Sequence, residues 1–374
     1  MSELKVDTVV DAAGTGKPNF SNGVTINGAA LSTLNLGEYT ASSSEPSSPK
    51  NGSIWWDTAN EKIFLYIAGE WKETIGIAPP AWFGERGLFF GGDSSGGANT
   101  TNVIDYVSIS SAGNATDFGD MVSNSYYPAA TSNGTRIIVT AGFTGGASND
   151  LLYVTSATTG NATFFGDLTT TTYNGGACSD ASRGIRWAGE SANTIDYVTI
   201  ETTGNATDFG DDVATINGGR ATSDKTYGFR AAGTSGDAFG LDSISYITIQ
   251  TTGNAIDFGD LLGATQAGGI CSDRTRAIYF GGHPNAKTNV IQYWTTGGTS
   301  GNASDFGDLT ATSSGQSASA NGTKAVCALG YTNSVSSPSN VINQVTIQTT
   351  ANATDFGDLT QARYGPAAAS GSDA

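Results

Sequence analysis

The sequence has little charge, few cysteines and no long apolar run. Only 14% of its 374 residues are charged, and 34 acidic against 17 basic side chains give a net charge of −17. This charge repels a phosphate backbone within the screening length of about 10 Å at moderate salt, so nucleic-acid binding is not expected. No stretch approaches the roughly 18 consecutive apolar residues that a membrane span needs, so membrane insertion is not expected either.

The start of the chain and its cysteines exclude two further classes. The opening residues MSELKVDTVVDAAGTGK carry charge where a secretory signal peptide has an apolar core. The protein is therefore expected to stay in the compartment where it is made, or to leave by assembly or lysis. Cys178, Cys271 and Cys327 are too few for a disulfide framework and lack metal-ligand spacing. We expect three small, buried thiols.

Residues for catalysis are scarce. The only histidine is His283, in GGHPNAK, which excludes a three-histidine metal site and leaves a Ser-His-Asp triad to be built around one loop residue. Glycoside hydrolysis usually needs a pair of carboxylates, and only two glutamates, Glu190 and Glu201, follow residue 86. A sialidase-like site would also need converging arginines, whereas Arg186, Arg220 and Arg230 are scattered among strands. We predict no enzyme activity, no catalytic residue and no cofactor.

An eight-residue phrase, GNATDFGD (113–120), is abundant instead. It returns as GNATFFGD, GNATDFGD, GNAIDFGD, GNASDFGD and ANATDFGD. Its phenylalanines, Phe118, Phe165, Phe209, Phe258, Phe306 and Phe356, are spaced by 47, 44, 49, 48 and 50 residues. A period in the forties with short β-type bursts, separated by Gly, Asn, Ser and Asp, is typical of a β-propeller. The fold class is therefore predicted to be all-β.

Each repeat has four strand-like parts. A strand such as GLFFGG (87–92) is followed by one such as VIDYVSI (103–109), then by the DFGD strand after a Thr-Thr-Gly-Asn turn. The fourth part is rich in Gly and Ala, as in YYPAATSNG (126–134), and suits the innermost position, where only small side chains fit.

The two ends of the array complement each other. The first copy begins at residue 86 without an inner strand, and the chain ends on an inner-strand pattern, RYGPAAASGSDA (363–374). We predict a six-bladed propeller over residues 86–374, closed when the C-terminal strand joins the first blade, near Phe89 and Ala368. If the inner strand is counted first, strands such as GLFFGG, which end in Gly-Gly, stand second in the repeat. This order of parts and the Gly-Gly resemble Kelch-type propellers, although DFGD is not the usual Kelch outer strand. That resemblance concerns architecture and implies little about partners.

The phrase itself is predicted to be structural. A calcium loop needs several oxygens at alternate positions, and each phrase offers only two carboxylates, of which GNATFFGD has lost one. No metal site is therefore predicted. Asp is expected to accept backbone N–H bonds at turns, Gly119 to permit a bend, and Phe118 to fill the space between blades.

The first 85 residues form a separate β-rich region. Residues 1–40 are predicted to attach or oligomerise, residues 41–50 to be a linker, and residues 51–85 to contain a small meander with strands IWWD, KIFLYIA and WKETI. About 25 residues cannot fold alone. The aromatic side chains Trp55, Trp56, Phe64, Tyr66 and Trp71 are thus expected in a core or an interface, with a sugar-binding platform as the alternative.

Three segments resemble a known class of proteins. SELKVDTVV…FSNGVTINGAAL, EPSSPKNGSIWWDTANEKIFLYIAGEWKE and the strings GNATDFGDL and IDYVTI look like parts of tail-fibre-like virion structural proteins of marine bacteriophages, especially cyanophages. The resemblance implies a virion component, assembled in the host cytoplasm, whose residues 1–85 contact other virion proteins and whose C-terminal part faces outward. It implies a homo-oligomer, with a trimer favoured.

Function is expected where the copies differ. The connections after the Gly-Gly strand, 93–102, 234–242, 284–289 and 332–340, vary most and should share one face. Candidate recognition residues are Asp93, Asn99, Phe239, Asp242, His283, Lys287, Tyr331 and Asn333. The leading hypothesis is a tail fibre or tail appendage that recognises a glycan or protein of the host surface. A lectin-like propeller and a capsid decoration protein stay open as alternatives.

Overall fold

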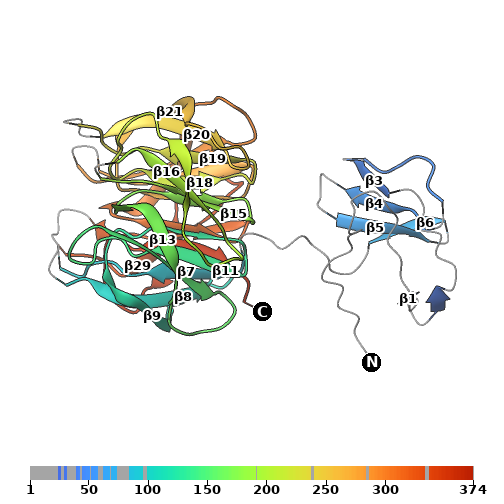
Figure 1. Cartoon of the computed structure of the whole chain (residues 1–374), viewed down its shortest axis with the longest axis horizontal. Coiled ribbons are helices and arrows are strands. Elements are labelled where there is room, and N and C mark those ends of the chain that lie inside the picture. The colour runs from blue at the N-terminus through green and yellow to red at the C-terminus, as the bar shows by residue number, and fades with distance from the viewer. Residues whose placement is uncertain are drawn as a thin grey trace. The chain divides into compact units, whose positions relative to one another are not determined.

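The computed structural model describes residues 24–26, 29–31, 39–42, 44–50, 52–57, 62–67, 69–73, 84–95, 99–190, 192–236, 240–283, 286–332 and 337–373. The chain divides into two compact units, Met1–Pro79 and Pro80–Ala374, both drawn in Figure 1. The described residues form strands and no helix. The fold class is therefore all-β, as the sequence predicts.

The N-terminal unit contains a strand pair and a four-stranded sheet. β1 (Val24–Ile26) pairs with β2 (Ala29–Leu31), and the sheet has the order β3-β4-β5-β6. Its strands are β3 (Tyr39–Ser42), β4 (Ile54–Asp57), β5 (Lys62–Ile67) and β6 (Glu70–Glu73). The last three are the predicted meander, whose first turn lies outside the described residues.

The predicted linker is wrong at its start. Residues 41 and 42 belong to β3, which pairs in parallel with β4. The indole N–H of Trp55 also donates to the carbonyl of Ser42 at 3.1 Å. An edge strand held by backbone pairing needs no apolar alternation of its own, and the sequence pattern therefore did not mark it.

The aromatic side chains of this sheet pack on one another. Trp55 is buried and stacks on Phe64 with ring centroids 4.9 Å apart. Trp71 meets Trp55 and Tyr66 edge-on, at 5.7 and 5.2 Å. The expected core role is confirmed for Trp55, whereas Phe64, Tyr66 and Trp71 pack against one another or against Trp55 and are half-buried.

Six sheets follow one another in the C-terminal unit, and we number them in chain order. Sheet 1 is β31 (Ala367–Gly371), β7 (Arg86–Phe90), β8 (Thr101–Ser108) and β9 (Thr116–Ser125); sheet 2 is β10 (Ala130–Ser132), β11 (Arg136–Thr140), β12 (Ser148–Thr155) and β13 (Thr163–Thr172); sheet 3 is β14 (Ala177–Ser179), β15 (Arg183–Trp187), β16 (Thr194–Thr199) and β17 (Thr207–Asp211). Sheet 4 is β18 (Arg220–Ser223), β19 (Tyr227–Ala231), β20 (Leu241–Thr248) and β21 (Ile256–Thr265); sheet 5 is β22 (Gly269–Ser272), β23 (Arg276–Phe280), β24 (Thr288–Thr295), β25 (Ser304–Ser314) and β28 (Tyr331–Thr332); sheet 6 is β26 (Ser317–Ala320), β27 (Lys324–Ala328), β29 (Val341–Thr346) and β30 (Thr354–Asp358).

The strand order agrees with the predicted repeat. The Gly/Ala-rich strand stands first in each sheet and the DFGD strand stands last, apart from the added β28 in sheet 5. β31 from the end of the chain completes sheet 1 by pairing with β7, with Ala368 opposite Phe89. This is the pairing that the sequence predicts. The connections are shorter than expected, since β8, β20 and β24 begin at Thr101, Leu241 and Thr288.

Neighbouring sheets are joined in series through the repeated phrase. The backbone N–H of Asp120 in sheet 1 donates to the side-chain oxygen of Asn161, the asparagine of the next copy, at 3.0 Å. The same bond recurs at every step, and the sixth copy returns to the first through Asp358 N–H and Asn114 Oδ1 at 3.1 Å. The accepting side chain is therefore the Asn of the phrase, whereas the sequence predicted its Asp.

The other two predicted roles of the phrase are confirmed. Its six phenylalanines are buried, each at most 3% exposed, and Phe118 belongs to a core cluster that also holds residues of sheet 2, such as Ile137 and Leu152. At Gly119, with φ +149, an added Cβ would overlap the carbonyl of Gly160. Only glycine allows this close approach of two sheets.

Candidate functional site

The six sheets have two different ends. At the turn end, the inner strand turns into the second strand and the third turns into the outer one. At the loop end, the second strand leads to the third, and the outer strand leads to the inner strand of the next sheet. We use these two names below.

The turn end repeats the same side-chain contacts. In sheets 2 to 6, the tight turn begins with Asn or Asp, whose Oδ1 accepts the N–H of the residue three positions later. The same turns reach the next sheet, for example from Asn133 to Glu201, and from Asn321 of sheet 6 back to Ser110 of sheet 1. These contacts describe a scaffold.

The loop end is built on backbone atoms. One residue in each link between sheets has a left-handed backbone: Tyr127, Asn174, Gly218, Ala267, Gly315 and Gly365, with φ between 51° and 74°. The N–H of each donates to the carbonyl of the one before it, and Tyr127 donates to Gly365 at 2.8 Å, so that the series of bonds returns to its start. We call these the ring positions.

Two side chains per sheet surround the ring positions. The residue before each ring position, the link position, contacts the residue that follows the Gly-Gly strand, the loop position, through backbone bonds. The pairs are Tyr126 and Phe143, Tyr173 and Glu190, Asn217 and Thr234, Gln266 and His283, Ser314 and Tyr331, and Tyr364 and Asp93. The backbone is thus fixed, while the side chains differ from sheet to sheet.

Aromatic side chains gather along one part of this rim. We call Tyr126, Tyr127, Phe143, Tyr173, Tyr331 and Tyr364 the aromatic arc. Tyr331 stacks on Tyr364 at 4.1 Å, Tyr364 meets Tyr127 at 5.9 Å, and Tyr126 lies 4.9 Å from Tyr127 and 5.2 Å from Phe143. Phe143 meets Tyr173 at 5.1 Å. All but Tyr364 are partly exposed, so the arc presents ring surface to solvent.

Two carboxylates accompany the arc. Asp93 is buried beside Tyr364, and its Oδ1 accepts the N–H of Ser95, whereas its Oδ2 has no hydrogen-bond partner. The Oε2 of Glu190 likewise has none. Burial, together with Asp93 and Glu190, raises the pKa of Tyr126 above its ordinary value. Burial also raises the pKa of Tyr127 to about 12, so the arc keeps its phenol protons at neutral pH.

The remaining rim is polar. The side-chain amide of Asn174 donates to Asn217 Oδ1 at 2.6 Å, and Gln266 and His283 occupy the next pair of positions. Arg220 places its guanidinium 5.7 Å from the ring of Tyr127. Lys287 lies over Tyr331, with 5.2 Å between the ammonium and the ring centroid.

A narrow channel runs behind the ring positions. Its cavity of about 90 Å³ is lined by the six inner strands, which contribute small side chains such as Ala130, Ser179, Ser223 and Ala369. The predicted innermost place of these strands is thereby confirmed. Cys178 and Cys271 also line it, and all three cysteines are free and buried, as expected.

The structure brings several of the predicted recognition residues together. Asp93, His283 and Tyr331 are loop positions on the rim, and Lys287 contacts Tyr331. Asn99 is exposed in the loop that begins at Asp93, and Asp242 is exposed in β20. Phe239 and Asn333 lie outside the described residues.

Sequence reasoning missed the link positions. It assigned the segments YYPAA, YNGG and RYGPAA to inner strands. It sought candidate recognition residues only in the connections after the Gly-Gly strand. A signal was present, because Tyr126, Tyr173 and Tyr364 stand where the other copies have Asn217, Gln266 and Ser314. Aligning the copies on their DFGD strands would have exposed this variation.

The rim offers binding chemistry. Partly exposed rings, with unpartnered carboxylate oxygens beside them, match a ligand that has apolar faces and hydroxyl edges, as a sugar ring does.

The described residues contain no group of three or more His, Cys, Asp or Glu side chains placed to hold a metal ion. Within the same residues, no helix is long and apolar enough to cross a membrane. No protein-family model matches the sequence, and no curated protein matches it either.

Proposed function

We propose that the chain is a non-enzymatic structural protein of a bacteriophage particle, a tail fibre or tail appendage, and that the loop end of its C-terminal unit recognises a glycan of the host surface. The aromatic arc is the observation that carries the recognition part. Its rings occupy positions that vary between copies, on a backbone that does not, and such positions on a rigid scaffold are where proteins usually bind.

In this proposal the C-terminal unit is a six-bladed Kelch-like β-propeller. Three features support it: six sheets with one strand order, a phrase that joins each sheet to the next and the sixth to the first, and inner strands that line one channel. Averaged electron-microscope images along the channel should show six lobes. Images with an open ring or another number of lobes would contradict the propeller. They would not contradict the proposal that the loop end binds a glycan.

The virion part rests on the resemblance of the N-terminal segments and repeat strings to phage tail-fibre-like proteins. Residues 1–85 then attach the protein to other virion proteins, in a homo-oligomer that is a trimer. Antibodies against the protein should label the tail or an appendage of intact particles. Labelling of the capsid shell alone would favour a decoration protein instead.

The recognition part is tested by glycan binding of the full chain. We expect binding to at least one host-surface glycan and a loss of at least tenfold in affinity for Tyr126→Ala. The matched control is Phe164→Ala, because Phe164 is an aromatic side chain 53% exposed on the outer strand β13, and this variant should bind normally. Equal loss in both variants would reject the rim as the site, and release of sugar from the bound glycan would reject the non-enzymatic assignment.

A further inference from the structure

Arg220 is an exception among the inner strands. It begins β18, at the place where the other inner strands have Ala129, Gly176, Gly269, Ser317 and Ala367. Its Nε donates to the carbonyl of Gly268 at 3.2 Å, and its Nη1 donates to Asn174 Oδ1 and to its neighbour's carbonyl, both at 3.2 Å. The guanidinium thus reaches across the ring positions at the mouth of the channel.

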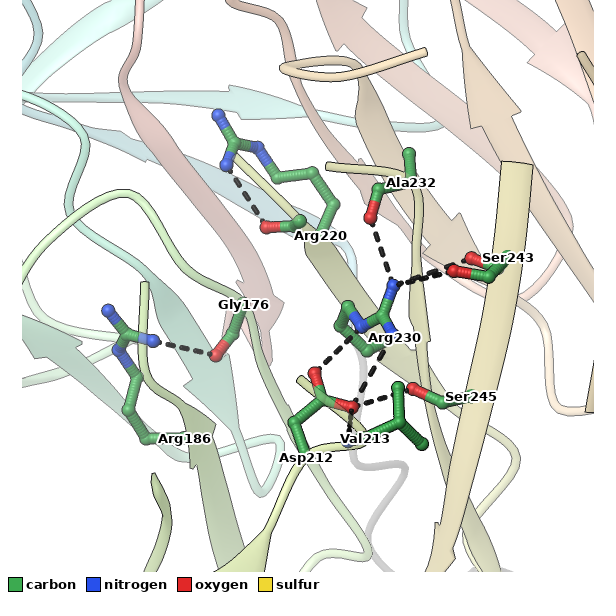
Figure 2. A network of polar contacts seen from close by, with 10 residues as sticks. Gly176, Arg186, Asp212, Val213, Arg220, Arg230, Ala232, Ser243 and Ser245 are labelled. Atoms are coloured by element: carbon green, nitrogen blue, oxygen red, sulfur yellow. Dashed lines mark hydrogen bonds and ion pairs between the residues drawn. The ribbon is translucent and has the colours of Figure 1, made fainter. Parts of the chain in front are cut away.

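No carboxylate of the described residues forms an ion pair with Arg220. Arg230 and Arg363, by contrast, pair with Asp212 and Asp105 at 2.9 and 2.8 Å. Figure 2 shows the difference: Arg230 is enclosed by Asp212, Ala232 and Ser243, whereas Arg220 points away from that network and has a single carbonyl contact in the view. Arg220 is half-buried, and this burial lowers its pKa, because a guanidinium is costly to remove from water without a counter-charge.

The space beside Arg220 is a polar cavity. About 50 Å³ in volume, it lies at the mouth of the channel and is lined by all six inner strands or the links before them, together with Arg220 and Gln316. Two buried side-chain oxygens in its lining, Gln316 Oε1 and Ser317 Oγ, have no hydrogen-bond partner. The cavity therefore offers a cation and a hydroxyl donor to an anion, and an acceptor to a neighbouring hydroxyl.

The cavity adjoins the aromatic arc. Tyr127 belongs to the arc and lies next to the guanidinium of Arg220. The acidic groups of the rim, Asp93 and Glu190, act on the phenol of Tyr126, and Asp93 also acts on Tyr127. The groups that perturb Arg220 itself are Tyr279 and Tyr127. A ligand seated on the arc can thus place a negative group beside the guanidinium of Arg220, which forms no ion pair with a carboxylate of the described residues.

We propose that the channel mouth is a subsite for the carboxylate of an acidic sugar, such as a uronic or sialic acid, whose ring lies on the aromatic arc. This inference rests on the proposed recognition of a glycan and names its class. The Nε and Nη1 of Arg220 already donate to protein oxygens, which leaves Nη2 to donate a charge-assisted hydrogen bond to a carboxylate oxygen. A sugar acid also carries the adjacent hydroxyl that Gln316 Oε1 accepts.

The first experiment compares two oligosaccharides on the full chain, one of glucuronic acid and one of glucose with the same linkage. We expect at least tenfold tighter binding of the acidic oligosaccharide, and a loss of that preference in Arg220→Met. The matched control is Lys225→Asn, which removes an exposed cation from the turn end of the same sheet. Asn also suits its left-handed backbone, with φ 88°. This control should keep the preference.

A second experiment tests the anion subsite without a glycan. Acetate should raise the Tm of the protein in a saturable way, while chloride at the same ionic strength should not, and Arg220→Met should abolish the rise. An acetate response in a protein that binds neither sugar would keep the subsite and reject the recognition proposal. Equal responses to acetate and chloride would mean an adventitious ion only. That result, or an acidic preference that survives Arg220→Met, would overturn the inference.

Discussion

The turn end and the loop end of the six sheets both join neighbouring sheets, but they do so with different atoms. At the turn end, neighbouring sheets are joined by Asn and Asp side chains that recur from copy to copy. At the loop end, they are joined by the N–H and carbonyl groups of the ring positions. A contact made by a side chain requires one type of amino acid at that position, whereas a contact made by backbone atoms allows many types. Repetition therefore marks the scaffold, and variation marks the positions whose side chains can differ without changing the backbone.

The largest effect is expected where the loop end breaks its own pattern. Arg363 precedes the link position Tyr364, where other sheets have Ser, Thr or Ile, and it forms a fully buried ion pair with Asp105 of sheet 1. Asp105→Ala leaves the guanidinium buried and unpaired, which should lower the free energy of unfolding by about 3–5 kcal/mol. Chemical denaturation measures this loss. The double variant Asp105→Leu with Arg363→Met should recover most of it, and failure to do so would mean that the pair has a role beyond charge compensation.

The next effect concerns the turn end. An added Cβ at Gly357 would overlap the carbonyl of Gly113, and its φ is +148°, whereas a Cβ at Gly113 would meet nothing within 4 Å. We expect Gly357→Ala to cost about 2–4 kcal/mol, from overlap and backbone strain together. Gly113→Ala, in the facing residue, should change stability by less than about 1 kcal/mol. Similar losses in the two variants, measured by thermal unfolding, would contradict the close approach of sheets 1 and 6.

A gain in stability is expected at Arg186. This side chain lies at the position of Arg230 in the next sheet, but its Nε and Nη2 are buried without hydrogen-bond partners. Burial lowers the pKa of Arg186 to about 9. Arg186→Met should therefore raise the free energy of unfolding at pH 7 by about 1–4 kcal/mol.

The pH dependence of this gain has a definite sign. Between pH 9 and 12.5 the unfolded chain holds a proton on Arg186 that the folded chain has released. The stability of the native sequence then rises with pH, and the advantage of Arg186→Met shrinks. Paired denaturation curves at pH 7 and pH 10 measure the difference. An advantage that stays the same at both pH values would show that the side chain is well solvated.

The smallest change in stability is expected at the ring itself. Tyr127 has φ 51°, and Asn174 holds the equivalent ring position with φ 57°. Asn tolerates this backbone better than Tyr, so Tyr127→Asn should alter the free energy of unfolding by no more than about 1 kcal/mol. It should nevertheless weaken glycan binding, because it removes a ring from the arc. A loss above about 3 kcal/mol would mean that the side chain, and not the backbone, holds the loop end together.

The fold was more visible in the sequence than the site was. The spacing of Phe118 and its equivalents predicted six repeats of four strands, and the Gly/Ala-rich tail predicted that residues near Ala368 would pair with Phe89. These features recur along the chain, and such repeats can be recognised by comparing a single sequence with itself. Arg220 occurs at one of six equivalent positions, and a link-position tyrosine such as Tyr126 occurs in three of the six copies. Their importance depends on neighbours brought together from several sheets, which spacing along the chain does not reveal.

The pairing of β31 with β7 also sets the order in which the protein can be completed. Sheet 1 is encoded first among the six, yet its inner strand, Ala367–Gly371, leaves the ribosome after all the others. Until then β7 presents an unpaired edge, which another growing chain could occupy. Sheets 2 to 6 need no such wait. A message cut short in the last repeat would therefore yield chains whose β7 edge is exposed and prone to aggregate. Only chains that include β31 can pair this edge within the molecule.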